Sequence, residues 1–124
     1  MQSRSYTVII LGTETKRFAI YTEPSVGQNI QSFLTKEQKS RPLTHDLMNG
    51  IFRGLEIKPL QIVINNIEDT IYFARLFLEQ QIGDQKIILE IDARPSDCIT
   101  LAIVHNTPVF CSKEIFEKTI PVEE

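Results

Sequence analysis

The hydrophobic residues of the chain change their spacing several times, and each change predicts a new element. Two runs of β-branched and aromatic residues, 6–11 and 17–22, flank a short polar segment and predict a hairpin of two strands. Apolar residues then recur at helical spacing over 25–37. This spacing predicts a short amphipathic helix, followed by a polar loop over 36–41.

The clearest amphipathic pattern begins at Pro42. An apolar residue returns at every fourth position from there, which predicts a helix that turns this stripe toward a core. The stripe consists of Leu43, Leu47, Ile51 and Leu55, widened by Met48 and Phe52. The opposite, polar side consists of Asp46, Asn49 and Arg53.

Three strands are expected next, at 60–67, 70–80 and 86–92. The connections between them are short, which favours an antiparallel meander. The middle run carries apolar side chains on both of its faces, so we expect a central strand with Tyr72 and Phe73 shielded from solvent.

The segment from Pro95 to about Asn106 predicts a helix with almost no polar face, and such a helix must be covered on all sides. One sheet covers only one side of a helix. We therefore expect a partner subunit to cover the rest, in a homo-oligomer that is most simply a dimer. The alternative is that the helix over 25–37, or a last short helix over 115–119, folds across it within one chain. A short strand is expected over 108–111.

Together these elements predict an α+β fold, with a largely antiparallel sheet of about six strands and three to four packed helices. The length of 124 residues suits a single domain over 1–124. The longest apolar runs are far shorter than the about 20 residues of a membrane-spanning helix. Residues 1–5 lead directly into a strand rather than a secretory segment, so we expect a cytoplasmic protein with no membrane partner.

The charge balance limits which partners the protein can attract. The chain has 13 Lys and Arg against 16 Asp and Glu, for a net charge of −3 and a pI near 5.4. This excludes a strong positive field, so binding of nucleic acid requires a local cluster of Arg and Lys. Cys98 and Cys111 show no spacing typical of a metal site and are expected to be buried thiols.

Two of the expected helices begin in the same way, with an Arg-Pro pair followed by an Asp in the first turn. The two starts are Arg41-Pro42 with Asp46, and Arg94-Pro95 with Ser96 and Asp97. Free backbone N–H groups at a helix start, beside a guanidinium, form a natural phosphate site. The alternative is structural, with each Asp offsetting the helix dipole or pairing with its Arg.

Phosphodiester hydrolysis requires oxygen ligands for a divalent cation, a base that activates water, and a cation that holds the phosphate. The residues around the two helix starts can supply these groups: His45, Asp46, Asp92, Arg94, Ser96 and Asp97. Asp92 can equally be a solvated strand end, and His45 a buried structural histidine. We assign a structural role to His105, at the C-terminus of its helix.

These stretches also resemble the two signature motifs of the bifunctional nuclease domain family, bacterial and plant proteins described as acting on DNA and RNA. The motifs are RPLTHDL at 41–47 and DARPSDCITLA at 92–102. Residues 67–74 resemble the family's middle segment, which commonly has a Gly at about Asp69 or Thr70, and 108–110 resemble its ending. Residues 23–28 depart from the family's Ile-Gly pair and following acidic residue.

The resemblance implies a nuclease that hydrolyses phosphodiester bonds of DNA, RNA or both. On the motif positions we assign Asp46, Asp92 and Asp97 as ligands of Mg²⁺ or Mn²⁺. The catalytic groups are His45, Asp92 and Asp97, with His45 as the base. The phosphate-binding residues are Arg41, Arg94 and Ser96. We expect the two helix starts to share one polar cleft. A competing function is a non-catalytic oligomeric module that binds an anionic ligand or a partner protein, with each Asp engaged by an arginine.

Overall fold

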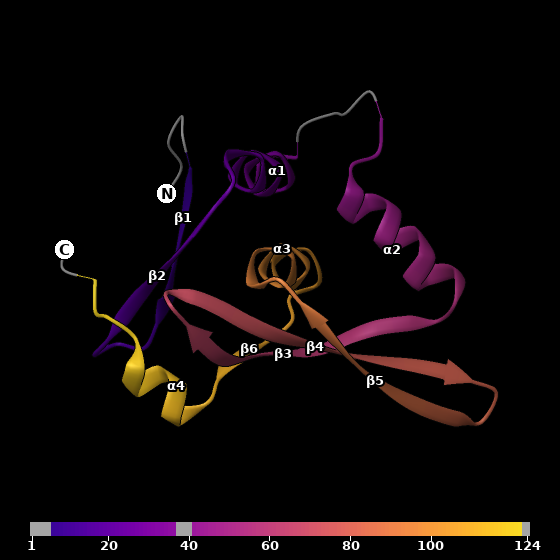
Figure 1. Cartoon of the computed structure of the whole chain (residues 1–124). Coiled ribbons are helices and arrows are strands. Elements are labelled where there is room, and N and C mark those ends of the chain that lie inside the picture. The colour runs from indigo at the N-terminus through magenta and orange to yellow at the C-terminus, as the bar shows by residue number, and fades with distance from the viewer. Residues whose placement is uncertain (1–5, 37–40, 123–124) are drawn as a thin grey trace.

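The computed structural model describes residues 6–36 and 41–122, which form an α+β fold (Figure 1). In chain order the elements are β1 (Thr7–Gly12), β2 (Arg17–Thr22), α1 (Pro24–Leu34), α2 (Thr44–Gly54), β3 (Ile57–Glu68), β4 (Ile71–Ile82), β5 (Gln85–Ala93), α3 (Pro95–His105), β6 (Val109–Cys111) and α4 (Lys113–Lys118). The expected loop over 36–41, and the end of the helix expected over 25–37, fall partly on residues outside the described ranges. None of the described helices is long and apolar enough to cross a membrane.

The six strands in the described part of the chain divide into two sheets. β1 and β2 pair as an antiparallel hairpin, and the other four form a sheet in the order β5-β4-β3-β6, in which only β6 runs parallel to its neighbour. The expected number of strands is confirmed, but the expectation of one six-stranded sheet is wrong. The hairpin packs Phe18 and Ile20 into the core instead of adding to an edge of the larger sheet.

The expected meander and its central strand are confirmed. β4 pairs antiparallel with β3 on one side and with β5 on the other. Tyr72 and Phe73 are both partly buried. Alternation along β4 places Ala74, Leu76 and Leu78 on the face that is fully buried.

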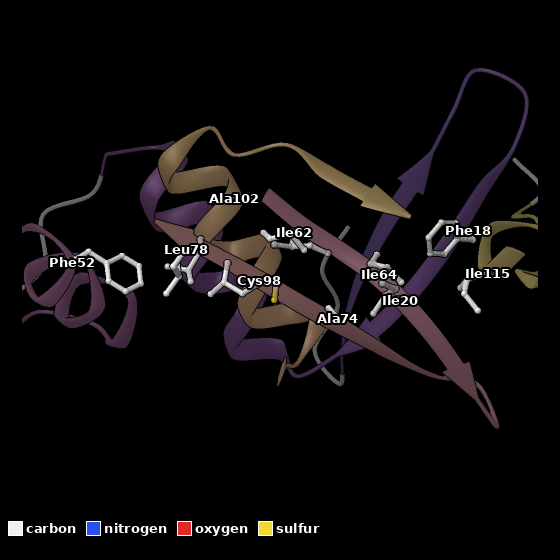
Figure 2. Packing of buried hydrophobic residues seen from close by; sticks show 13 residues of the cluster. Phe18, Ile20, Phe52, Ile62, Ile64, Ala74, Leu78, Cys98, Ala102 and Ile115 are labelled. Atoms are coloured by element: carbon white, nitrogen blue, oxygen red, sulfur yellow. The ribbon is translucent and has the colours of Figure 1, made fainter. Parts of the chain in front are cut away.

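The hydrophobic core lies where α3 packs on that face of the sheet (Figure 2). Ile62 and Ile64 of β3 are completely buried there, together with Cys98 of α3. The prediction of a buried thiol is therefore confirmed for Cys98, and Cys111 is partly buried. Phe18 closes the core at the end where α4 contributes Ile115 (Figure 2).

The prediction that α3 is covered on all sides is confirmed in part, since six of its eleven residues are buried, but the expected reason for a partner subunit is wrong. α3 packs against β3 and β4 on one side and against α1 and β2 on the other, all from the same chain. Figure 1 shows α3 between α1 and the four-stranded sheet. The helix expected over 25–37 thus provides the cover, because the single residue between β2 and α1, Glu23, returns the chain directly over α3.

The orientation predicted for α2 is wrong in part, because Met48 and Phe52 of the expected stripe pack on the core and its other members do not. Leu47, Ile51 and Leu55 of the expected core stripe are 62%, 49% and 52% exposed, whereas His45 and Phe52 are buried. A residue that returns every fourth position drifts around a helix of about 3.6 residues per turn, so the pattern alone does not select the buried side. Packing selects it, because α2 contacts the C-terminal end of α3. There, Asn49 hydrogen-bonds His105 and the Phe52 ring lies 6.1 Å from the His105 ring.

The β3–β4 connection has unusual backbone geometry. Asp69 and Thr70 form a two-residue turn in which both residues have positive φ, 49° and 69°. Such hairpin turns favour Gly, because a Cβ atom is disfavoured at positive φ and a β-branched residue most of all. This explains the glycine expected here from the family resemblance.

We predict that Thr70→Gly raises the free energy of unfolding by about 1 kcal/mol, because relief of the positive-φ strain exceeds the extra chain entropy that glycine loses. Urea titration of the purified variant measures this change. Thr70→Ala is the control, since it keeps a Cβ atom at the same φ and should gain less. Equal stability of wild type and Thr70→Gly would contradict the turn geometry.

We also predict a pH dependence that arises from His105. Burial lowers the pKa of His105 below its ordinary value. The unfolded chain therefore binds a proton at higher pH than the folded protein does, and stability decreases as pH falls through the unfolded value of about 6.5. Urea titrations between about pH 7.5 and about pH 5.5 should show a smaller loss of stability in His105→Gln than in wild type. Identical pH slopes would exclude this role.

Candidate functional site

A groove of about 720 Å³ opens beside the N-terminus of α3. One wall is formed by the end of β2 and the residue that follows it, Glu23. Thr70 of the β3–β4 turn and Tyr72 of β4 also line the groove, and the α3 start contributes Arg94 and Ser96. The groove therefore joins the second sequence motif to residues far from it in the chain.

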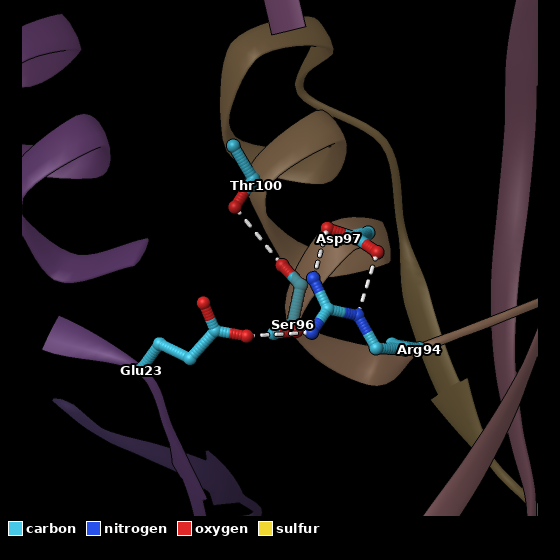
Figure 3. A network of polar contacts seen from close by, with 5 residues as sticks. All are labelled: Glu23, Arg94, Ser96, Asp97 and Thr100. Atoms are coloured by element: carbon cyan, nitrogen blue, oxygen red, sulfur yellow. Dashed lines mark hydrogen bonds and ion pairs between the residues drawn. The ribbon is translucent and has the colours of Figure 1, made fainter. Parts of the chain in front are cut away.

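Arg94 is the central charged group of this groove (Figure 3). Its Nε and Nη2 donate to the two carboxylate oxygens of Asp97 at 3.0 and 3.2 Å, and its Nη1 donates to Oε1 of Glu23 at 2.8 Å. The hydrogen bonds to Asp97 and to Glu23 raise the pKa of Arg94 above its ordinary value. The guanidinium is thus a cation held between two carboxylates.

The start of α3 adds a second binding feature to the groove. Pro95 occupies the first turn, and the backbone N–H groups of an N-terminal turn favour negative charge. Ser96 is buried, and its backbone oxygen accepts a hydrogen bond from the Thr100 hydroxyl at 2.9 Å. Burial raises the pKa of Tyr72, so this phenol remains a neutral hydrogen-bonding group.

Asp92 does not join the groove contacts of Asp97. It lies opposite Arg75 in the β4–β5 register, and its Oδ1 is 3.7 Å from Nη1 of that arginine. Arg75 also donates from Nε to Glu90 at 3.3 Å. Because neighbouring strand residues point to opposite faces, Asp92 points away from the face on which Ala93 and α3 lie.

The first motif also lies elsewhere. α2 meets α3 at His105, and an eleven-residue helix separates that end from Arg94 by about 16 Å. Asp46 accepts a hydrogen bond from the backbone N–H of Leu43 at 2.7 Å and so caps α2. None of residues 41–47 lines the groove beside the α3 start, so this groove is not the expected cleft shared by the two helix starts.

The remaining groups of the first motif have different environments. His45 is buried, and its Nε2 lies 3.5 Å from Oδ1 of Asp46 without a hydrogen-bond partner among the described residues. Arg41 is exposed, three residues before α2. Within 6–36 and 41–122, no group of three His, Cys, Asp or Glu side chains is arranged to hold a metal ion, so the structure does not assemble Asp46, Asp92 and Asp97 into one site.

Neither cysteine provides a nucleophile. Burial raises the pKa of Cys98 to about 12, with further contributions from Asp97 and Asp92. Burial likewise raises the pKa of Cys111. Both thiols therefore stay protonated at neutral pH.

Sequence reasoning assigned no role to Glu23 or to Arg75. Glu23 directly follows β2 and precedes the proline that starts α1, close to where the family pattern expects an acidic residue. This position, next to the expected acidic residue, is the only sequence feature that could have identified Glu23. Arg75 could have been suspected as the one charged residue between apolar neighbours in the middle of β4.

The comparisons with known proteins agree with the motif resemblance. The model of the bifunctional nuclease domain matches residues 8–123. Two Mycobacterium tuberculosis proteins are each 24% identical over 94 residues: uncharacterized protein MT1877 of strain CDC 1551 and uncharacterized protein Rv1829 of strain H37Rv. The match covers 73% of this chain and 53% of each relative, so the chain spans about half the length of these relatives. Because the domain model matches nearly the whole chain, the protein belongs to the bifunctional nuclease domain family.

Proposed function

We propose that the protein is a nuclease that hydrolyses phosphodiester bonds of DNA, RNA or both, with the groove at the start of α3 as its active site. The observation that carries this proposal is the position of Arg94, Ser96 and Asp97. These residues of the second family motif line or border one groove, beside a helix N-terminus that favours anions.

In this proposal Arg94 and the first turn of α3 bind the scissile phosphate. Arg94 then exchanges one of its present carboxylate partners for phosphate oxygens. Both ion pairs are largely exposed, with Arg94 60% exposed, and exposed pairs contribute only about 0–1 kcal/mol. The exchange therefore requires little free energy, and the guanidinium suits bidentate contact with phosphate.

Glu23 and Asp97 are the groups that fit a divalent cation. Both already hold one cation, the Arg94 guanidinium, and both offer oxygen ligands. Mg²⁺ needs only one or two carboxylates when waters and phosphate oxygens complete its shell. When bound, Mg²⁺ or Mn²⁺ supplies charge stabilisation to the phosphate and lowers the pKa of a coordinated water. Asp46, Asp92, His45 and Arg41 lie outside this proposed site.

A second candidate function is a non-catalytic module that binds an anionic ligand or a partner protein. The observation that favours it is the saturation of Arg94 by two carboxylates, which leaves the groove with more negative than positive charge. The net charge of −3 acts in the same direction against a polyanion.

The proposal includes a homodimer in the cytoplasm. Two copies bring two grooves onto one particle, which strengthens binding to a long nucleic acid through avidity. The free thiols Cys98 and Cys111 fit a reducing compartment.

We predict that Asp97→Asn lowers the rate of cleavage of labelled single- or double-stranded DNA or RNA by about tenfold or more in Mg²⁺ or Mn²⁺, because a metal ligand is lost. Asp84→Asn is the matched control, since it makes the same change at an exposed carboxylate in the β4–β5 turn, outside the groove. EDTA should abolish the wild-type activity. Equal activity of the two variants, or activity that resists EDTA, would assign Asp97 to structure.

We predict that Glu23→Gln separates binding from cleavage. Loss of one carboxylate frees Arg94, so the Kd for a short oligonucleotide without divalent metal should become about two- to fivefold tighter, while the rate of cleavage with metal should fall. Glu90→Gln, beside Arg75, is the control and should change neither value. Tighter binding without any wild-type cleavage would favour the non-catalytic module.

A further inference from the structure

β5 is an exposed edge of the four-stranded sheet. It pairs with β4 on one side only, and eight of its nine residues are exposed. Four of the exposed side chains are large and apolar. They are Ile87 (40%), Ile88 (54%), Leu89 (37%) and Ile91 (42%).

A free sheet edge with several large apolar side chains exposed is unusual in a monomeric protein. A free edge presents unpaired N–H and C=O groups, and natural monomers usually block it with bulges, prolines, short length or charged side chains such as Lys. β5 carries one lysine, Lys86, beside its four large apolar residues. β5 has no proline, and it pairs with β4 without interruption over its full length. The opposite edge, β6, is only three residues long.

We propose that β5 is a dimer interface, in which it pairs antiparallel with β5 of a second copy about a two-fold axis perpendicular to the sheet. This assembly joins two four-stranded sheets into one continuous sheet. It deepens the dimer included in the proposed function, but it does not depend on nuclease activity. The occupant is inferred from the residue pattern of β5 itself.

Symmetry restricts the possible registers. A two-fold axis perpendicular to the sheet leaves the core face of both copies on the same side of the joined sheet. Each residue must therefore lie opposite a partner residue whose side chain points to the same face. This holds only if one residue of β5 lies opposite its own copy at the axis. An axis at Leu89 pairs every residue of Gln85–Ala93 with one of the partner strand. No other centre pairs the whole strand.

The Leu89-centred register pairs apolar residues at the centre of the core face and opposite charges on the other face, where Ile88 also lies opposite the partner's Glu90. On the core face, Ile87 lies opposite the partner's Ile91, and Leu89 lies opposite the partner's Leu89. On the other face, Lys86 lies opposite the partner's Asp92, and symmetry produces this ion pair twice. Apolar and opposite-charge pairs across strands are both stabilising, and no like charges meet in this register.

A second apolar surface adjoins this edge. Gln80 lies opposite Ile87 in the β4–β5 register, and its side chain donates a hydrogen bond to the backbone oxygen of Leu55. Leu55 ends the exposed row on α2 that also contains Leu47 and Ile51. The dimer places this end of α2 beside the partner's Ile91, which extends the contact beyond the strand pair. Stable interfaces usually bury about 1,200 Å² or more, so this additional surface matters.

Light scattering and sedimentation of the full chain test the proposal. Wild type should have about twice the chain mass of 14.2 kDa at micromolar concentration. Leu89→Lys should give the monomer mass, because it places two ammonium groups together at the axis. Ile10→Lys on β1 is the matched control, since Ile10 is a strand residue of similar exposure, 40%, and the variant should stay dimeric. Circular dichroism verifies that both variants fold.

Charge reversal tests the register without relying on an apolar substitution. Lys86→Glu should raise the dimer dissociation constant at least about fivefold by opposing the partner's Asp92. Adding Asp92→Lys in the same chain should restore the wild-type dissociation constant, whereas adding Glu90→Lys should not. A monomeric wild type, loss of the dimer in Ile10→Lys but not in Leu89→Lys, or equal rescue by both second changes would overturn the proposal.

Discussion

The burial of α3 between the four-stranded sheet and α1 is the contact on which the rest of the structure depends. Cys98, Leu101 and Ala102 are fully or nearly fully buried, and the face below them is formed by β3 and β4. This packing fixes the axis of α3, so it also fixes where the helix begins. The groove exists because that start lies beside the end of β2 and the β3–β4 turn.

Local patterns in the sequence predicted the elements that depend on neighbours in the chain. The β3–β4–β5 meander follows from short connections, and the burial of α3 follows from its lack of a polar face. The orientation of α2 and the division of the strands into two sheets depend on contacts between distant segments. Leu47 and Phe52 both belong to the predicted stripe, but only Phe52 is buried, in the core and beside His105.

The sequence predicted those residues of the candidate site that are close together in the chain, and missed those that long-range contacts bring to it. Arg94, Ser96 and Asp97 are close in sequence and share one helix start, so a motif could identify them together. Asp92 belongs to the same motif, but strand alternation turns it to the other face of the sheet, beside Arg75. Glu23 reaches Arg94 across 71 positions of the chain, and no periodic pattern reports a contact of that separation.

The ion pairs of Arg94 have a thermodynamic consequence for any ligands of the groove. The same contacts occupy both the guanidinium and the carboxylates of Glu23 and Asp97. An anion that takes the guanidinium releases the carboxylates for a cation, and a cation that takes the carboxylates releases the guanidinium for an anion. Each ligand therefore raises the affinity for the other by the same factor, because coupling between two binding events is reciprocal. A groove whose cation and carboxylates are already paired with each other therefore binds an anion or a cation alone weakly, and binds the two together more tightly.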